Sequence, residues 1–386
     1  MTEKIARYLA SENPATPCLV MDVDRVVENY RRVAGLLPGA EIYYAVKANP
    51  APLVLRALAA EGASFDAASI HEIESVLENG GRPDRISFGN TIKKEADIAA
   101  AHDLGIDLFA FDAAAELEKL SRAAPGARVY CRLLLTNTGS GWPTSRKFGC
   151  DAEMARDLLL GAARAGLDAY GVSFHVGSQQ TDLAQWDIAI ARAKLLFSAL
   201  EKSGVRLSMV NLGGGLAVPY RDEVPVAGGT SAPVPSLEAG CGAITTALTR
   251  HFGNRCPRII AEPGRALVAD AGMIAAEVVL ISAKGYGDPK RWVYLDIGKF
   301  GGLAETMDEC IRYQVVTDRD GGPTGPVVLA GPSCDETDVL YDQAGYEMPL
   351  DMAVGDQVRI LSAGAYTSSY ASVGFNGFPP LAEHFI

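Results

Sequence analysis

Short apolar runs typical of β-strands alternate with segments of helical periodicity from Ile42 to Arg265. The intervening segments, such as PLVLRALAAEG and IHEIESVLENG, carry apolar residues at helical spacing, and several end in glycine. Eight such repeats within about 225 residues predict a (β/α)8 barrel, with a doubly wound parallel sheet as the alternative. The eight strand-like runs are IYYAVKAN (42–49), ASFDAAS (63–69), RISFGN (85–90), LFAFD (108–112), VYCRLLL (129–135), AYGVSFHVG (169–177), SMVNLGGG (208–215) and RIIAEPGR (258–265).

The pattern changes after Arg265. Strand-like segments separated by Gly, Pro and Asp predict a second, mainly antiparallel β domain over 266–386, following the barrel over 26–265. An N-terminal segment, 1–25, is expected to add a strand to this β domain through TPCLVMDVDRV. The stretch GGTSAPVPS (228–236) is expected to be a loop-like insertion.

Composition excludes several classes of protein. With 386 residues, 48% hydrophobic residues and a net charge of −12, the chain is expected to be globular and to bind neither nucleic acid nor an anionic membrane. The N-terminus lacks the apolar core of a signal peptide, and no stretch approaches the roughly 18 apolar residues of a membrane span. Seven scattered cysteines without CxxC spacing predict neither a disulfide framework nor a metal site, which favours a cytoplasmic location.

Polar side chains follow several of the predicted strands. In a barrel these positions meet at one mouth, where active sites lie. Isolated, Asp66 or Ser178 could cap a helix, His175 could be structural and Lys47 could extend to the rim. Because all of these residues are expected at the same mouth of the barrel, an active site is favoured over these separate structural roles. The residues are Lys47, Asp66, Asn90, His175, Ser178 and Glu262.

Glycines and an arginine follow the last two predicted strands. Gly213, Gly214 and Gly215 allow backbone N–H groups to converge on an anion, and Arg265, after Gly264, adds charged donors. This combination predicts a phosphate site. A lysine, a histidine and an acid beside a phosphate site indicate pyridoxal phosphate: Lys47 for the aldehyde, Glu262 for the pyridine nitrogen and His175 against the ring.

Seven motifs resemble those of the ornithine decarboxylase family, which are pyridoxal-phosphate enzymes of alanine-racemase-like fold. They occur in the family's order as YYAVKAN, FDAAS, SFHVGSQ, NLGGG, AEPGR, GPSCDETDVLY and GAYTSSYASVGFNGFPPL. The resemblance implies a homodimer whose active sites are shared across the interface. It also implies that Asp66 lies beside the lysine-bound aldehyde, and that the phosphate is surrounded by Ser178, Gly213, Gly214, Gly215, Gly264, Arg265 and Tyr366.

The resemblance further implies roles for residues of the second subunit. Cys334 would protonate the α-carbon after carbon dioxide leaves, and Asp335 would pair with the distal ammonium of the substrate. Within DIGKFGGLAETMDECIRY (296–313), Phe300 matches the family's aromatic position, and Asp308 and Glu309 fall where an acid grips the substrate tail. This segment resembles bacterial members, some of which also accept lysine.

The expected activity is decarboxylation of L-ornithine to putrescine. One methylene is worth only about 1–3 kcal/mol in a pocket, so a dual lysine/ornithine enzyme is an alternative. Arginine or diaminopimelate decarboxylation and racemisation are further alternatives, although Asp335 would repel a second carboxylate. A non-catalytic homologue is disfavoured because Lys47, Glu262 and Cys334 are all present.

Overall fold

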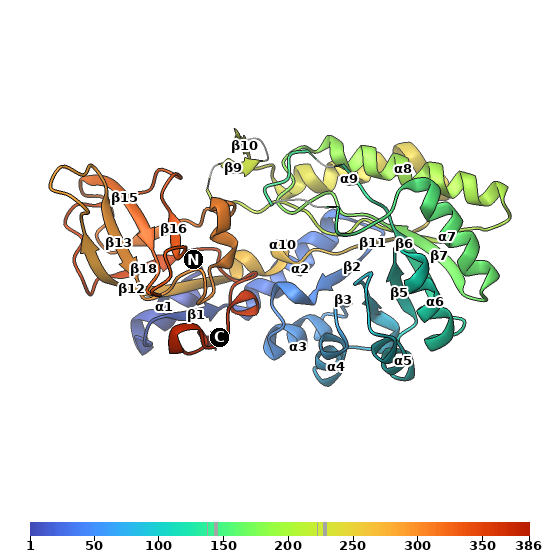
Figure 1. Ribbon diagram of the computed structural model, residues 1–386, viewed down its shortest axis with the longest axis horizontal. Coiled ribbons are helices and arrows are strands. Elements are labelled where there is room, and N and C mark those ends of the chain that lie inside the picture. Colours follow the sequence, from blue (N-terminus) through green and yellow to red (C-terminus); the bar gives the residue numbers. More distant parts are fainter. Residues whose placement is uncertain (137, 143–145, 222, 227–229) are drawn as a thin grey trace.

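The computed structural model describes residues 1–136, 138–142, 146–221, 223–226 and 230–386. Eight parallel strands close into a barrel in the order β11-β2-β3-β4-β5-β6-β7-β8, as predicted (Figure 1). Most of their residues are buried, as expected for strands covered on both faces. The strands are β2 (Ala40–Ala45), β3 (Ser64–Ala67), β4 (Ile86–Phe88), β5 (Leu108–Phe111), β6 (Arg128–Arg132), β7 (Asp168–Ser173), β8 (Met209–Asn211) and β11 (Arg258–Ala261).

Helices cover the outside of the barrel. Ser69, Asp151 and Ser236 cap three of them, because their side-chain oxygens accept the backbone N–H of Glu72, Met154 and Ala239. The helices are α2 (Val23–Leu36), α3 (Pro52–Ala60), α4 (Ile70–Glu78), α5 (Glu95–Asp103), α6 (Ala114–Ala123), α7 (Ala152–Arg164), α8 (Ala184–Lys202), α9 (Leu237–Phe252) and the short α10 (Arg265–Val268).

The second part of the molecule is a nine-stranded, mainly antiparallel sheet, shown on the left in Figure 1. Only the pairs β13–β15 and β1–β19 are parallel. Helix α1 (Glu3–Glu12) contributes Ile5 to a small apolar cluster with residues of this sheet. The strands are β1 (Cys18–Met21), β12 (Gly272–Ser282), β13 (Arg291–Leu295), β14 (Val315–Thr317), β15 (Thr324–Ala330), β16 (Val339–Tyr341), β17 (Glu347–Pro349), β18 (Gln357–Ile360) and β19 (Ala382–Phe385).

The N-terminal segment lies in this sheet. Strand β1 pairs antiparallel with β12 and parallel with β19, so the two ends of the chain meet there. The expected strand in TPCLVMDVDRV is therefore present. The boundaries drawn at residues 25 and 265 stay predictions.

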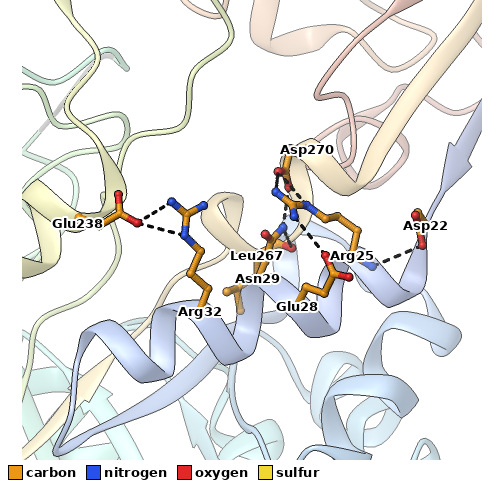
Figure 2. Close-up of polar contacts among 8 residues, drawn as sticks. All are labelled: Asp22, Arg25, Glu28, Asn29, Arg32, Glu238, Leu267 and Asp270. Carbon is orange, nitrogen blue, oxygen red and sulfur yellow. Dashed lines mark hydrogen bonds and ion pairs between the residues drawn. The ribbon is translucent and has the colours of Figure 1, made fainter. Parts of the chain in front are cut away.

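Helix α2 is joined to the segment that leaves the barrel by a polar cluster (Figure 2). The Arg25 guanidinium bonds to Asp270, in the 3₁₀ turn η4 (Ala269–Ala271), with an Nη2–Oδ2 distance of 2.7 Å. The Asn29 amide donates to Leu267 O at 3.1 Å and to Asp270 Oδ1 at 2.6 Å. These contacts fix α10, which begins at Arg265.

One expectation was wrong. The stretch 228–236 is not simply a loop, because β10 (Thr230–Pro233) pairs antiparallel with β9 (Glu223–Val226). Residues 228 and 229 lie outside the described part of the chain. The prolines and small residues of this stretch are typical of a loop, and β10 has no apolar face that would indicate a strand. The short two-stranded ribbon was therefore not predicted.

In the described part of the chain, every helix is too short or too polar to cross a bilayer.

Candidate functional site

Two adjoining cavities open at the carboxyl ends of the barrel strands. The first cavity has a volume of about 110 Å³ and the second about 420 Å³. Residues shared by both are Lys47, Arg132, His175, Ser178, Arg265 and Tyr366. The first cavity is also lined by Tyr130, Gly214, Gly215, Glu262 and Gly264, and the second by Leu133, Leu134, Leu135, Trp142, Phe148, Glu305 and Tyr370.

Lys47 lies in the 3₁₀ turn η1 (Val46–Ala48), directly after β2. The β domain holds this turn, since Tyr366 N donates to Ala48 O at 2.8 Å and Ser369 Oγ to Lys47 O at 3.1 Å. Burial acts to lower the pKa of Lys47, but Tyr366, Asp66 and Glu262 together reverse this, so the pKa is raised. The lysine therefore carries its charge among acidic neighbours.

Asp66 is buried at the end of β3 and caps no helix. Its carboxylate accepts Ser87 Oγ at 3.0 Å, while Ser69 caps α4. Burial, followed by the charge of Glu262, raises the pKa of Asp66 well above its ordinary value. A Cβ on Gly89 would lie 1.8 Å from Asp66 Oδ1, so only glycine fits beside this carboxyl group.

Glu262 follows β11 and is held by Asn211, a fully buried residue at the end of β8. Asn211 Nδ2 donates to Glu262 Oε1, and Asn211 Oδ1 accepts Gly213 N at 2.9 Å. Asn211 thus connects the acid to the glycine segment. This holds the Glu262 carboxylate at the wall of the first cavity.

His175 lines both cavities from the segment after β7. Burial, with the charges of Arg132 and Lys47, lowers the pKa of His175 to about 3. The imidazole is therefore neutral at physiological pH. A neutral flat ring suits contact with the face of an aromatic cofactor.

The glycine segment brings the backbone close to neighbouring strand ends. Gly213 and Gly215 have φ values of +65° and +127°. A Cβ on Gly214 would lie 2.7 Å from Glu262 O, and one on Gly264 would lie 2.9 Å from the Ala48 Cβ. Glycine at these positions therefore lets the backbone segments pack closely at the cavity that Ser178 and Arg265 line, where backbone N–H groups suit a phosphate.

Arg265 is almost fully buried and is paired with a residue that the sequence did not indicate. Its Nη1 bonds to Glu305 Oε2 at 2.6 Å and to Tyr220 Oη at 2.7 Å, and its Nη2 bonds to Glu305 Oε1 at 2.6 Å. Among the described residues, its Nε has no hydrogen-bond partner. A buried unpaired donor next to a glycine-lined space fits a phosphate group.

The residues expected to act in the second subunit do not line either cavity of their own chain. Phe300 packs against Phe375, with ring centroids 4.5 Å apart. Cys334 is exposed, and its N–H donates to Asn376 Oδ1 at 3.1 Å. Asp335 Oδ1 accepts the N–H and hydroxyl of Thr337 at 2.8 and 2.6 Å.

The two tail acids are placed differently from each other. Asp308 is exposed, whereas Glu309 Oε1 accepts the backbone N–H groups of Asp342 and Gln343, both at 2.7 Å. Within a single chain, Glu305 is the acid of this segment that lines the second cavity.

Sequence reasoning missed several site residues. Arg132 and Asn211 end the strands β6 and β8, so the strand-end rule that found Lys47 could have found them too. Asn90, which the same rule did single out, lines neither cavity; its amide donates to Ala68 O at 3.3 Å. Tyr220 and Glu305 had no comparable signal.

Comparisons with known proteins agree with this geometry. Residues 23–269 match the profile of the pyridoxal binding domain of pyridoxal-dependent decarboxylases. Lysine/ornithine decarboxylase of Selenomonas ruminantium is 35% identical over 378 residues, covering 98% of this chain and 91% of that protein. Antizyme inhibitor 2 of Xenopus laevis is 31% identical over 398 residues, covering 100% of this chain and 84% of that protein.

A solved structure shares the whole architecture. Lysine/ornithine decarboxylase from Vibrio vulnificus, complexed with cadaverine, superposes with a TM-score of 0.86 at 31% identity, over 99% of this chain and 97% of that one. The chain therefore belongs to the pyridoxal-phosphate-dependent basic amino acid decarboxylases of alanine-racemase-like fold, and pyridoxal phosphate is its cofactor.

Proposed function

We propose that this chain decarboxylates L-ornithine to putrescine, with Lys47 holding the cofactor. The observation that carries the proposal is one cavity that combines Lys47, Glu262 and neutral His175 with the glycine segment and Arg265. Bound pyridoxal phosphate supplies an electron sink for the charge left on the α-carbon when carbon dioxide departs.

Each residue of the cavity would have a separate task. Lys47 Nζ would attach the aldehyde, with Asp66 beside it. Glu262, fixed by Asn211, would keep a proton at the pyridine nitrogen, and His175 would pack on the ring. Ser178, the glycines, Arg265 and Tyr366 would hold the phosphate.

We propose that a second copy of the chain completes the site. Cys334 is exposed and its N–H donates to Asn376, in a segment whose apolar side chains a dimer interface would cover: Tyr370, Val373, Phe375 and Phe378 are 44%, 94%, 36% and 42% exposed. From the partner, the Cys334 thiol would protonate the α-carbon, and Asp335 would attract the distal ammonium. Phe300, Asp308 and Glu309 would border the tail of the substrate.

The alternatives are set by the distal end of the substrate. Relatives named lysine/ornithine decarboxylases support a dual enzyme, because one methylene changes binding by only about 1–3 kcal/mol. Diaminopimelate is disfavoured by the negative charge of Asp335. One relative is named an antizyme inhibitor, so a non-catalytic role is a further alternative. It is disfavoured because Lys47, Glu262 and Cys334 are all present. The cytoplasmic location stays a prediction.

The test is amine formation by the full-length protein with pyridoxal phosphate and, separately, L-ornithine, L-lysine, L-arginine and diaminopimelate. We expect putrescine from ornithine, with the other amines formed far more slowly. Comparable cadaverine from lysine would make the enzyme dual. Lys47→Ala is the control, and it should lose the visible absorbance of the lysine-bound cofactor together with nearly all turnover. Full activity of that variant would refute the assignment of Lys47.

A further inference from the structure

A buried ion pair joins the cofactor cavity to the β domain. Glu305 lies in the 3₁₀ segment η5 (Ala304–Glu309) and is 3% exposed, while Arg265 at the start of α10 is 6% exposed. Both carboxylate oxygens bond to the guanidinium at 2.6 Å. Both residues line the second cavity, so the pair lies at the wall of the site.

The donors of Arg265 can be counted one by one. A guanidinium has five N–H groups in a planar arrangement. Glu305 takes one on each terminal nitrogen, and Tyr220 takes the other on Nη1. The edge formed by Nε–H and the remaining Nη2–H is left, and the structure gives Nε no partner among the described residues. Two parallel donors on one edge match two phosphate oxygens.

Other contacts hold the guanidinium in this orientation. The Tyr366 ring lies 4.8 Å from the Arg265 carbon Cζ, and the Tyr220 ring 5.7 Å. Asn29 of α2 bonds to Leu267 O and to Asp270 and so fixes α10, the helix that Arg265 begins (Figure 2). Arg265 is therefore oriented before any phosphate arrives.

The charges explain what Glu305 adds. Burial alone would lower the pKa of Arg265, and the Glu305 carboxylate together with Tyr220 and Tyr366 more than reverses this. A buried guanidinium without a counter-ion is costly, so the pair stabilises the protein when no phosphate is bound. Once a phosphate is bound, the same carboxylate lies near a second anion and repels it.

We propose that Glu305 is a positioning residue of the phosphate site: it serves as the built-in counter-ion of Arg265, presents one edge of the guanidinium to the phosphate and limits the affinity for the cofactor. This inference rests on the proposed pyridoxal phosphate site around Lys47, and it adds the residue that sets the strength of phosphate binding.

The direction in which cofactor affinity changes in a Glu305 variant separates this role from a merely structural one. In Glu305→Gln, phosphate supplies the negative charge that Arg265 has lost, so binding should tighten. We expect the dissociation constant for pyridoxal phosphate, measured by equilibrium dialysis of the full-length protein, to fall roughly tenfold. The increase in melting temperature caused by inorganic phosphate should grow in parallel. Unchanged or weaker binding would overturn the proposal.

Three further variants make the result specific. Glu116→Gln is the matched control, because Glu116 is also buried, at 4% exposure, and ion-paired, with Lys93 at 2.9 Å, but it lines neither cavity. It should leave cofactor affinity unchanged.

Glu305→Asp keeps the charge, so its dissociation constant for pyridoxal phosphate should stay near that of the parent protein. This variant tests the proposal even if Glu305→Gln folds poorly. In an Arg265→Gln background, Glu305→Gln should no longer tighten binding, and a persisting gain would show that Glu305 does not act through Arg265.

Ligand binding by the parent protein distinguishes a wrong cofactor site from a wrong role for Glu305. If the parent protein binds neither pyridoxal phosphate nor inorganic phosphate, the cofactor site itself is wrong. If the parent binds both and Glu305→Gln is not tighter, only the role of Glu305 is wrong.

Discussion

At the scale of single residues, the site depends on charges held away from their ordinary protonation states. Asp66 is pushed toward its protonated form by burial and by Glu262, whereas His175 is kept neutral. Neighbouring groups whose pKa values are driven in different directions are typical of catalytic sites. The cause is the crowding of ionisable groups at one end of the barrel.

His175 has a consequence for stability that can be measured. With its pKa lowered to about 3, the folded protein leaves His175 unprotonated at pH values where the unfolded chain binds a proton. Stability should therefore fall as the pH drops from about 6.5 toward 3, by up to about 1.4 kcal/mol per pH unit. His175→Phe keeps a flat ring but binds no proton. Its melting temperature should therefore fall less than that of the parent protein between pH 8 and pH 4. An identical pH dependence in parent and variant would show that His175 binds its proton in the folded protein at the same pH as in the unfolded chain.

At the scale of elements, the barrel could be predicted because its strands are continuous apolar runs between helical segments. In the β domain the prediction was less complete. Strands of three or four residues, such as β16 and β19, leave too little periodicity to read, and the pairing of β1 with β19 joins residues far apart in sequence. Glu305 could not be chosen from the acids of ETMDE, because the backbone leaves helical geometry at Met307 and Asp308, so helical spacing does not tell which acid turns inward.

The connection between β6 and α7 is the element that we expect to tolerate change least. Phe148 and Trp142 from this connection line the second cavity. At Gly149, with φ of +90°, a Cβ would lie 2.7 Å from Leu134 N, and its own N–H donates to Asp112 Oδ2 at 2.6 Å. Gly149→Ala must therefore displace Phe148, and it should lower stability by about 1–3 kcal/mol and raise the KM for the amino acid several-fold.

Gly166 is a control that separates the effect of a steric collision at Gly149 from the effect of placing alanine at a positive φ. Gly166 has a similar φ of +81°, but a Cβ there meets nothing within 4 Å. Gly166→Ala should cost only about 1 kcal/mol of stability and leave KM unchanged. If the two variants have equal melting temperatures and equal KM values, the close approach at Gly149 has no role in shaping the cavity.

At the scale of the whole molecule, the proposed reaction needs residues from two chains at each site. The residues proposed to hold the cofactor lie at the barrel mouth, while Cys334 and Asp335 lie outside the cavities of their own chain. A single chain should therefore bind the cofactor but release product inefficiently or with misplaced protons. The exposed apolar side chains of residues 370–378, the segment whose Asn376 accepts the Cys334 N–H, are the surface that should become buried on assembly.

The most direct test of a reaction centre shared between two chains is to co-express Lys47→Ala with Cys334→Ala and to measure putrescine formation. Each variant alone should be nearly inactive or give abnormal product. In a mixed dimer one site combines an intact Lys47 with an intact Cys334, so random pairing should restore about a quarter of the parent activity. No recovery from mixed dimers that are shown to form and to bind pyridoxal phosphate would contradict a reaction centre shared between two chains.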